Sequence, residues 1–359
     1  MIANCFSGKK VLVIGHTGFK GSWLTIWLMQ LGADVAGYAL EPKTSRDNYV
    51  LSGLEERTRN YIADVRDKHT LNRVFKDEQP EIVFHLAAQP LVMTGYKQPV
   101  ETYETNIMGT VNLLEACRLT ESVKQIIIIT SDKCYENREW IWGYRENDAL
   151  GGYDPYSSSK AAVEIVCNGY RNSFFHPDKF SEHKKSLATV RAGNVIGGAD
   201  WAEYRIIPDC IRALESGEEI IIRNPQATRP WQHVLEPLGG YLLLAAKMMD
   251  DPVKFVGPWN FGPYQKSIVT VERLVETVIK NYGKGKWREI SDSESPHEAG
   301  LLALDISKVY LRLNWRPVLS FDETIRMTVE WYKKYSTGNV YDLCLQQIKA
   351  YMERWSMPK

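Results

Sequence analysis

Tyr156 and Lys160 are the residues whose types and spacing best suit catalysis. They stand four positions apart, so on a helix their side chains would project from the same face. A free tyrosine has a pKa of about 10 and is a poor base at neutral pH, but a lysine cation beside it favours the phenolate. The pair therefore predicts a general base acting on a hydroxyl group, although an ordinary surface pair on a helix has the same spacing.

A second segment with candidate catalytic residues lies earlier in the chain, at the end of an apolar run. Ile126 to Ile129 are β-branched without polar alternation, which predicts a buried parallel strand. Ser131, Asp132 and Lys133 follow that strand almost directly. A hydroxyl at a strand tip can hold a substrate oxygen, so we expect Ser131 to face the tyrosine–lysine pair.

A glycine-rich turn near the N-terminus supplies the context that such a pair needs. The apolar segment Val11 to Ile14 runs into this turn, and apolar residues from Trp23 to Leu31 then recur at helical spacing. Strand, glycine turn and helix together are typical of a dinucleotide site, where the glycines let the backbone approach a pyrophosphate at the helix N-terminus. A purely structural turn is the alternative. The predicted cofactor contacts in the turn are Gly15, Thr17, Gly18, Phe19, Lys20 and Gly21.

The next predicted strand, at 34–38, leaves the choice of cofactor open. The acid that usually binds the ribose is missing from its tip, where Ala39 and Leu40 stand. Lys43 and Arg46 are near enough to suit a 2′-phosphate, but the loop is also simply polar. This segment alone therefore does not distinguish NAD from NADP.

Two further strand ends are expected to border the cofactor. Asp64 follows a third predicted strand, and it either borders the adenine or caps a helix over 66–76. A fourth strand at 81–86 ends in small residues that would let a cofactor lie across its tip, and a long helix is predicted over 101–119. The remaining predicted cofactor contacts are Asp64, Val65, Leu86, Ala87, Ala88 and Asn106, together with Tyr156 and Lys160.

The later part of the chain suggests a second lobe. Arg229 offers a fork that suits a diphosphate, and Trp231 an aromatic face that suits a base, although either alone is also an ordinary structural residue. Further elements are predicted as strands at 187–191, 219–223 and 259–262 and as helices at 208–216, 269–281 and 321–335. We expect an α/β fold with a Rossmann-type doubly wound parallel sheet. Its predicted parts are a dinucleotide-binding domain at 1–193, with a returning segment near 231–262, and a smaller C-terminal α/β substrate-binding lobe at 194–359.

Composition narrows the class of protein. The 359 residues carry 44 Lys plus Arg and 44 Asp plus Glu, so no long-range field favours nucleic acid or an anionic membrane. The six cysteines are scattered without any C-x-x-C pair, which predicts reduced thiols, no metal site and a cytoplasmic protein. No segment has the length of a signal peptide core or of a membrane span.

Several stretches resemble one enzyme family over nearly the whole chain. They are Gly15 to Trp23, Ser131 to Tyr135, Gly151 to Tyr156, Arg191 to Gly197, and Arg229 to His233. With them the chain is similar to the extended short-chain dehydrogenase/reductases, and within these to the nucleotide-sugar 4,6-dehydratases. The dTDP-glucose members carry Thr-Asp-Glu at the strand tip. This chain has Ser131-Asp132-Lys133 there, which resembles the CDP-glucose branch.

The resemblance implies a reaction without net redox change. The tyrosine, helped by Lys160 and Ser131, would take the proton of the glucosyl 4-hydroxyl while C4 passes hydride to NAD. Lys133 would then remove the C5 proton, or alternatively stay charged and stabilise the enolate, and Asp132 would protonate the departing 6-hydroxyl. Hydride return to C6 would give CDP-4-keto-6-deoxyglucose. The substrate contacts that the resemblance implies are Gln89, Asn194, Arg205, Arg223, Arg229, Trp231 and His297.

Two other functions remain open at this point. A nucleotide-sugar epimerase or reductase shares the tyrosine–lysine pair but needs no acid and base at 132 and 133. A non-catalytic dinucleotide-binding protein is expected to keep the glycine turn and lose the pair. The resemblance also implies a homodimer or homotetramer through helices near 101–119 and 156–175, and a product used for deoxysugars of bacterial surface polysaccharide such as O-antigen.

Overall fold

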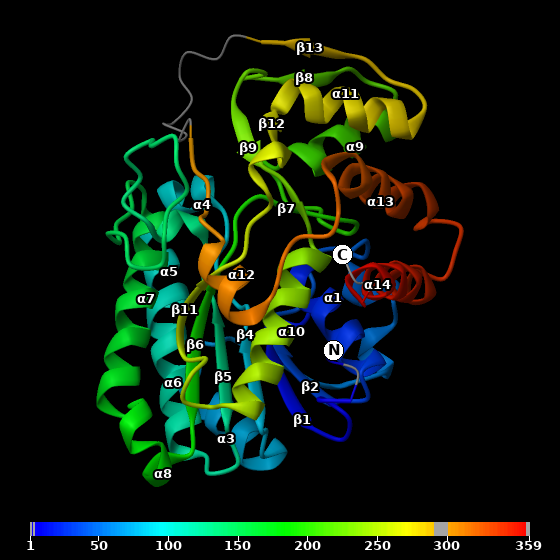
Figure 1. Ribbon diagram of the computed structural model, residues 1–359. Coiled ribbons are helices and arrows are strands. Elements are labelled where there is room, and N and C mark those ends of the chain that lie inside the picture. Colours follow the sequence, from blue (N-terminus) through cyan, green and yellow to red (C-terminus); the bar gives the residue numbers. More distant parts are fainter. Residues whose placement is uncertain (1, 3, 291–300, 357–359) are drawn as a thin grey trace.

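A seven-stranded sheet forms the centre of the molecule, as the computed structural model of residues 2, 4–290 and 301–356 shows (Figure 1). All its neighbouring strands are parallel, in the order β11-β6-β5-β4-β1-β2-β3. The strands are β1 Lys10–Ile14, β2 Asp34–Ala39, β3 Arg59–Ile62, β4 Ile82–His85, β5 Gln125–Ile129, β6 Ser186–Arg191 and β11 Gly257–Asn260. Chain order reverses between β1 and β4, where doubly wound sheets bind ligands. The predicted Rossmann-type sheet is confirmed.

Helices cover both faces of this sheet. The face on the left of Figure 1 carries α3 Lys68–Glu78, α5 Pro99–Tyr103, α6 Gly109–Leu119 and α7 Pro155–Ser173. The other face carries α1 Phe19–Gln30, α10 Leu235–Asp250 and α14 Val340–Ser356. Within β1, Val11 and Val13 belong to one core and Leu12 and Ile14 to the other. Burial on both faces explains why the central strands β1, β4 and β5 are mostly apolar without alternation.

The α10 helix was not predicted from the sequence. It is apolar nearly all round, so it lacks the amphipathic period that marks a surface helix, and it lies buried between the sheet and α14. Gly240 allows this packing, because a Cβ there would lie 2.3 Å from the ring of Phe261. α14 was also missed.

The long helix expected over 101–119 is interrupted. Between α5 and α6 the chain forms one wide π-helical turn, η2 Glu104–Met108. Such turns are often found at functional sites. Here the turn contains the buried Asn106.

A smaller lobe lies at the top of Figure 1. It contains α9 Ile206–Ser216, α11 Val271–Tyr282 and α13 Phe321–Lys334, and the paired strands β7 Val195–Ile196 with β10 Gln232–His233, β8 Ile220–Ile222 with β13 Trp287–Glu289, and β9 Thr228–Pro230 with β12 Ile268–Thr270. The short elements are α2 Asn48–Leu51, η1 Leu54–Glu56, α4 Val92–Lys97, η3 Asp132–Cys134, η4 Pro177–Lys179, α8 Phe180–His183, η5 Gln265–Ser267 and α12 Ser307–Leu313. The division of the chain near residue 193 stays a prediction.

The described helices include none that is long and apolar enough to cross a membrane.

Candidate active site

The tip of β5 carries the first three predicted catalytic residues. Ser131 caps the short helix η3, and its hydroxyl accepts a hydrogen bond from the backbone N–H of Lys133 at 3.2 Å. The same hydroxyl donates to Oδ1 of Asp132 at 2.9 Å. Asp132 is only 3% exposed, and Lys133 is half-buried. The segment is therefore rigidly turned at the carboxyl end of the central sheet.

The helix α7 brings the tyrosine–lysine pair to this tip. Its start is fixed by Pro155 in the first turn and by Asp154, whose side chain accepts from the N–H of Ser157 at 3.0 Å. Tyr156 and Lys160 are both buried, and Nζ of Lys160 donates to the carbonyl oxygen of Ile129 at 3.4 Å. The helix thus places the pair against the end of β5, next to η3.

The expected lowering of the Tyr156 pKa by Lys160 is not what the structure shows. Burial raises the pKa of Tyr156 to about 12, the hydrogen bond with Ser131 opposes that rise, and the charge of Asp132 adds to it. Burial also lowers the pKa of Lys160 to about 8, and Glu164 is the largest opposing influence. The pocket therefore disfavours the charged form of each residue, because desolvation is the largest influence on both pKa values.

Two residues beside Asp132 were not recognised in the sequence. A Cβ on Gly193, in the loop after β6, would lie 1.7 Å from Oδ2 of Asp132, so only glycine fits there. Tyr241 of α10 is fully buried, and the charge of Asp132 helps raise its pKa. Both contacts join segments far apart in the chain, so no local pattern signals them.

The glycine turn folds as a dinucleotide site requires. Gly15 has φ +95°, and a Cβ there would lie 2.6 Å from the backbone N of Ala87. A Cβ on Gly21 would lie 1.9 Å from the carbonyl oxygen of Gly15. Gly18 is the N-cap of α1 and offers no side chain to the first amide groups of that helix. Those amides and the positive end of the helix dipole suit a pyrophosphate.

Lys20 reaches the same region from the first turn of α1. Burial lowers its pKa to about 8, the charges of Lys160 and Arg205 lower it further, and Asp132 and Asp200 oppose them. Thr17 donates to the carbonyl oxygen of Leu40 at 2.9 Å, which ties the turn to the loop after β2.

Asn106 organises the segment after β4. Its carboxamide accepts from the backbone N–H of Gln89 at 2.8 Å and donates to Oγ of Ser159 at 2.8 Å. The side chain of Gln89 is engaged within its own segment, with Nε2 donating to the carbonyl oxygen of Leu91 at 3.0 Å and to Oγ1 of Thr102 at 2.9 Å. Asn106 therefore fixes the backbone beside Leu86, Ala87 and Ala88.

The alternative role of Asp64 as a helix cap is wrong. Asp67 caps α3, accepting from the N–H groups of His69 and Thr70, whereas Asp64 pairs with Arg66 at 2.6 Å. Val65 is buried.

Arg46, considered for a 2′-phosphate, is already engaged across the molecule. Its guanidinium forms an ion pair with Glu215 at 2.6 Å and lies 3.6 Å from the ring centre of Trp201. The loop after β2 is thereby joined to the smaller lobe. Lys43 is exposed.

The predicted substrate contacts of the smaller lobe lie on several elements. Arg205 precedes α9, pairs with the buried Asp200 at 2.8 Å, and is close enough to lower the pKa of Tyr156. The half-buried Arg229 and buried Trp231 stand on and after β9, and the indole N–H of Trp231 has no acceptor in the described part of the chain.

Three predicted substrate contacts remain. Asn194 is half-buried with φ +49°, and Arg223 is exposed. His297 lies outside the described residues.

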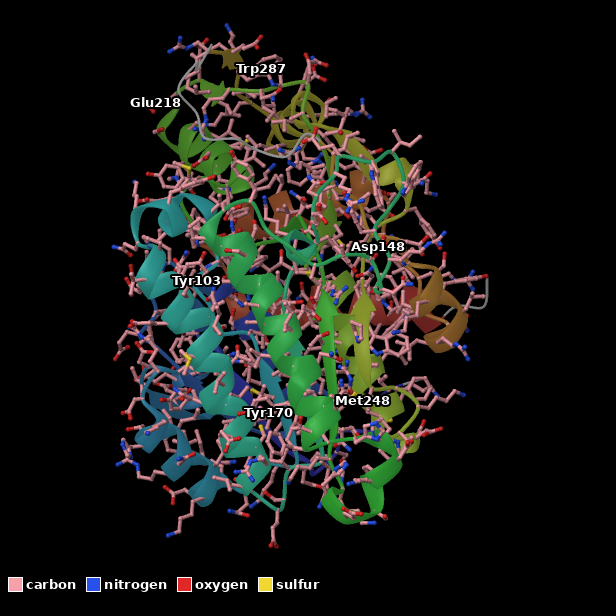
Figure 2. All side chains as sticks on the ribbon, turned by 90° about the vertical axis from the view of Figure 1, so that its left-hand side faces the viewer. Tyr103, Asp148, Tyr170, Glu218, Met248 and Trp287 are labelled. Carbon is pink, nitrogen blue, oxygen red and sulfur yellow. The ribbon has the colours of Figure 1, made fainter. Side chains whose placement is uncertain are left out.

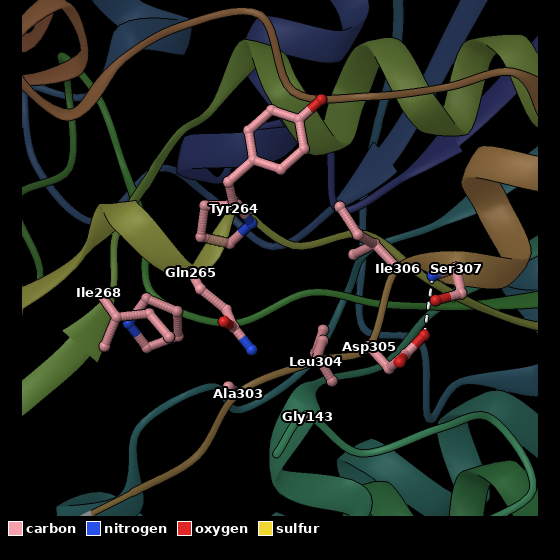
Figure 3. A pocket seen from close by; sticks show the side chains of 11 residues that line it. Gly143, Tyr264, Gln265, Ile268, Ala303, Leu304, Asp305, Ile306 and Ser307 are labelled. Carbon is pink, nitrogen blue, oxygen red and sulfur yellow. Dashed lines mark hydrogen bonds between the residues drawn. The ribbon is translucent and has the colours of Figure 1, made fainter. Parts of the chain in front are cut away.

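A separate cavity of about 180 Å³ lies beside the smaller lobe (Figure 3). Its lining includes Gly143, Pro230, Tyr264 and Asp305 but none of the predicted catalytic residues. Among residues 2, 4–290 and 301–356, no group of three or more His, Cys, Asp or Glu side chains is arranged to hold a metal ion. The six cysteines are free thiols.

Comparison with known families decides where this site belongs. The sequence model of the GDP-mannose 4,6 dehydratase family matches residues 12–328. The chain belongs to that family. A CDP-glucose 4,6-dehydratase of Salmonella typhimurium is 47% identical over 97% of this chain and 98% of its own length. A dTDP-glucose 4,6-dehydratase of the same organism is 25% identical over 90% of this chain and 92% of its own. The predicted membership of the nucleotide-sugar 4,6-dehydratases is confirmed.

Solved structures of the same fold extend beyond the dehydratases. DesIV, a dTDP-glucose 4,6-dehydratase of Streptomyces venezuelae with NAD bound, superposes with a TM-score of 0.76 over 90% of this chain and 97% of its own, at 22% identity. UDP-glucose 4-epimerase of Thermus thermophilus also gives 0.76, over 90% of this chain and 98% of its own, at 24% identity. These likenesses show the fold that this family of dehydratases shares with epimerases.

Proposed function

We propose that the protein is a CDP-glucose 4,6-dehydratase, which converts CDP-glucose to CDP-4-keto-6-deoxyglucose and water. The observation that carries this is the 47% identity to such an enzyme over 97% of the chain. The site supports it, because the Ser131-Asp132-Lys133 tip and the tyrosine–lysine pair meet at the carboxyl end of the sheet.

NAD is the proposed cofactor, and the glycine turn fits it. A Cβ on Gly15 or Gly21 would collide with the backbone of the turn, so these two glycines keep the turn compact beside the N-terminus of α1. Arg46 is committed to Glu215, which favours a cofactor without a 2′-phosphate. When bound, oxidised NAD accepts hydride from the sugar and later returns it.

The proposed first step is proton removal from the sugar 4-hydroxyl. Tyr156 takes that proton, and the hydroxyl of Ser131, which is close enough to lower the pKa of the tyrosine, turns from Asp132 to hold the same oxygen. Lys160 stabilises the phenolate from the helix turn below. Because burial raises the pKa of Tyr156 to about 12, proton removal needs the positive charge that oxidised NAD would add when bound.

The proposed second step is loss of water across C5 and C6. Lys133, in its neutral form, removes the C5 proton made acidic by the neighbouring ketone. Asp132, acting as the carboxylic acid, gives its proton to the 6-hydroxyl, which leaves as water, and Gly193 leaves room for this side chain. An epimerase needs neither group, so this strand tip distinguishes the two reactions.

The nucleotide half is proposed to lie on the smaller lobe. Arg205 and Arg229 would bind the diphosphate and Trp231 the nucleotide, with Gln89, Asn194, Arg223 and His297 as further contacts. Arg205 must then exchange its contact with Asp200, wholly or in part, for the ligand.

Assembly is proposed through the helices on the left of Figure 1. Large apolar side chains are exposed there, among them Val100 at 69%, Met108 at 50% and Ile165 at 61%. Figure 2 looks onto this face, with Tyr103 and Tyr170 labelled on it. Burial of these side chains in a dimer or tetramer would explain why they are exposed in the single chain.

We further propose that the enzyme is cytoplasmic and that its product is used in deoxysugar synthesis for surface polysaccharide such as O-antigen.

The purified protein should be incubated with CDP-glucose and NAD, and the product analysed by mass spectrometry. Loss of one water, with CDP-glucose preferred to dTDP-glucose and UDP-glucose, is the expected result. An unchanged mass with inversion at C4 would identify an epimerase instead, and no conversion of any of the three sugars would refute the proposal.

A further inference from the structure

Glu164 and Arg191 form a buried ion pair behind the predicted catalytic residues. Their side chains are only 3% and 2% exposed. Nε of Arg191 donates to Oε1 of Glu164 at 3.0 Å, and Nη2 donates to Oε2 at 2.9 Å. The carboxylate also accepts hydrogen bonds from the hydroxyls of Thr130 and Thr189. Burial alone would raise the pKa of Glu164, but these bonds hold it below its usual range.

The pair is tied to both ends of the catalytic strand tip. Thr130 directly precedes Ser131, and Tyr135 directly follows η3. Nη1 of Arg191 donates to the Tyr135 hydroxyl at 2.6 Å, and that hydroxyl donates to Oδ1 of Asn260 at 2.7 Å. A hydrogen-bond chain therefore brackets the segment 131–134 on either side.

The same carboxylate lies one helical turn beyond Lys160 on α7. Burial lowers the pKa of Lys160, and the charge of Glu164 is the largest influence that raises it. The other titratable groups that act electrostatically with Lys160 come from the elements around it. They are Cys134 on η3, Cys167 on α7, His85 on β4 and Lys20 on α1. Of these, His85 is neutral, because burial lowers its pKa to about 3.

Stability alone does not explain why a charged pair is buried at this place. Removing two charges from water costs several kcal/mol per ion, and well-packed apolar residues of similar volume are often as stabilising. An arginine fork, however, fixes direction as well as distance, which an apolar contact does not. We propose that Glu164 and Arg191 are positioning residues that hold the segment 131–133 against the helix carrying the tyrosine–lysine pair. This role rests on the proposed function.

The first test removes one hydroxyl and leaves the ion pair intact. Tyr135→Phe deletes the link between Arg191 and Asn260. We expect kcat for CDP-glucose to fall on the order of tenfold with little change in KM, because a small misplacement of catalytic groups is costly. Reduced cofactor should accumulate in the steady state, seen by its absorbance, because the elimination residues are loosened more than the oxidation pair.

Tyr351→Phe is the matched control. Its hydroxyl is also fully buried and donates to a carboxylate, Oε2 of Glu236 at 2.8 Å, but it lies on α14. We expect a similar loss of thermal stability with wild-type kcat. Equal effects of the two substitutions on kcat and on the reduced-cofactor fraction would overturn the positioning role.

The second test replaces the pair by apolar side chains. The double variant Glu164→Met with Arg191→Met leaves no unpaired buried charge, although the hydroxyls of Thr130, Thr189 and Tyr135 each lose a partner. It should fold with a lowered melting temperature and lose at least tenfold in kcat. A stable double variant with wild-type kcat would also overturn the proposal. If this variant does not fold, the comparison of Tyr135→Phe with Tyr351→Phe decides alone. Failure of the proposed function itself would appear in the wild-type protein, as absent conversion of CDP-glucose.

Discussion

Tyr156 is the proposed base for oxidation of the sugar. It is buried beside Asp132 and hydrogen-bonded with Ser131. Tyr156→Phe keeps the ring and removes only the proton acceptor. We expect CDP-glucose and NAD to bind with near-wild-type affinity in calorimetry, while formation of reduced cofactor slows on the order of 10²–10⁴-fold. Near-wild-type turnover would exclude Tyr156 as the base.

Lys133 is proposed to act in the elimination and not in the oxidation, so its replacement should separate the two steps. Lys133→Met keeps the length of the side chain and removes the amine. If Lys133 is the base, the variant should still form reduced cofactor from CDP-glucose, but no C5 hydrogen should exchange in deuterated water. Exchange near the wild-type rate would instead assign Lys133 to stabilising the enolate. Mass analysis of the recovered sugar measures both outcomes.

Lys160 should show a conflict between activity and stability. Burial lowers its pKa from 10.5 to about 8, so folding favours its neutral form. Between about pH 8 and pH 10.5 the lysine is protonated in the unfolded chain but mostly neutral in the folded protein. The free energy of unfolding therefore rises with pH across this range. Lys160→Met should melt higher than wild type at pH 7 and lose turnover, and the stability gain should shrink as pH rises from 8 to 10.5. A lower melting temperature at pH 7 would show that Glu164 outweighs the burial of the charge.

The tyrosine–lysine spacing could be recognised in the sequence because both residues lie on one helix. The pKa shifts could not be predicted, since they depend on burial in the folded protein and on charges from other elements, such as that of Asp132 on η3. Glu164 continues the same four-residue spacing beyond Lys160, a signal that was present but not used. Its partner Arg191 lies 27 positions away, and that contact exists only in the folded chain.

At the scale of elements, the loop after β6 is shaped by the site it borders. Gly193 must lack a Cβ, because Oδ2 of Asp132 would lie 1.7 Å from it. Gly193→Ala should displace that carboxylate and slow water loss on the order of tenfold or more, with smaller loss of NAD binding. The variant Gly169→Ala, on α7 where a Cβ meets nothing within 4 Å, is the control. Wild-type dehydration by Gly193→Ala would remove Asp132 from the acid role.

Two of the elements missed from the sequence were missed for different physical reasons. The residues of α10 are apolar on every side, so periodicity could not identify the helix, and its glycines argued against one. The π-helical turn η2 depends on the hydrogen bonds of Asn106 to Gln89 and Ser159, which come from other elements. By contrast, β1, β4 and β5 were found because burial on both faces leaves them continuously apolar.

At the scale of the whole molecule, the exposed apolar face of α5, η2, α6 and α7 predicts self-association. Ile165, on α7, is 61% exposed, and Val100, Met108 and Leu119 on the neighbouring elements are at least half exposed. Ile165→Glu should place a charge where the copies meet and convert the oligomer to monomer in light scattering. Ile141→Glu is the matched control, because that isoleucine is 84% exposed but lies on a loop and not on these helices. A wild-type protein that is already monomeric, or an Ile165→Glu variant as large as the control, would contradict this interface.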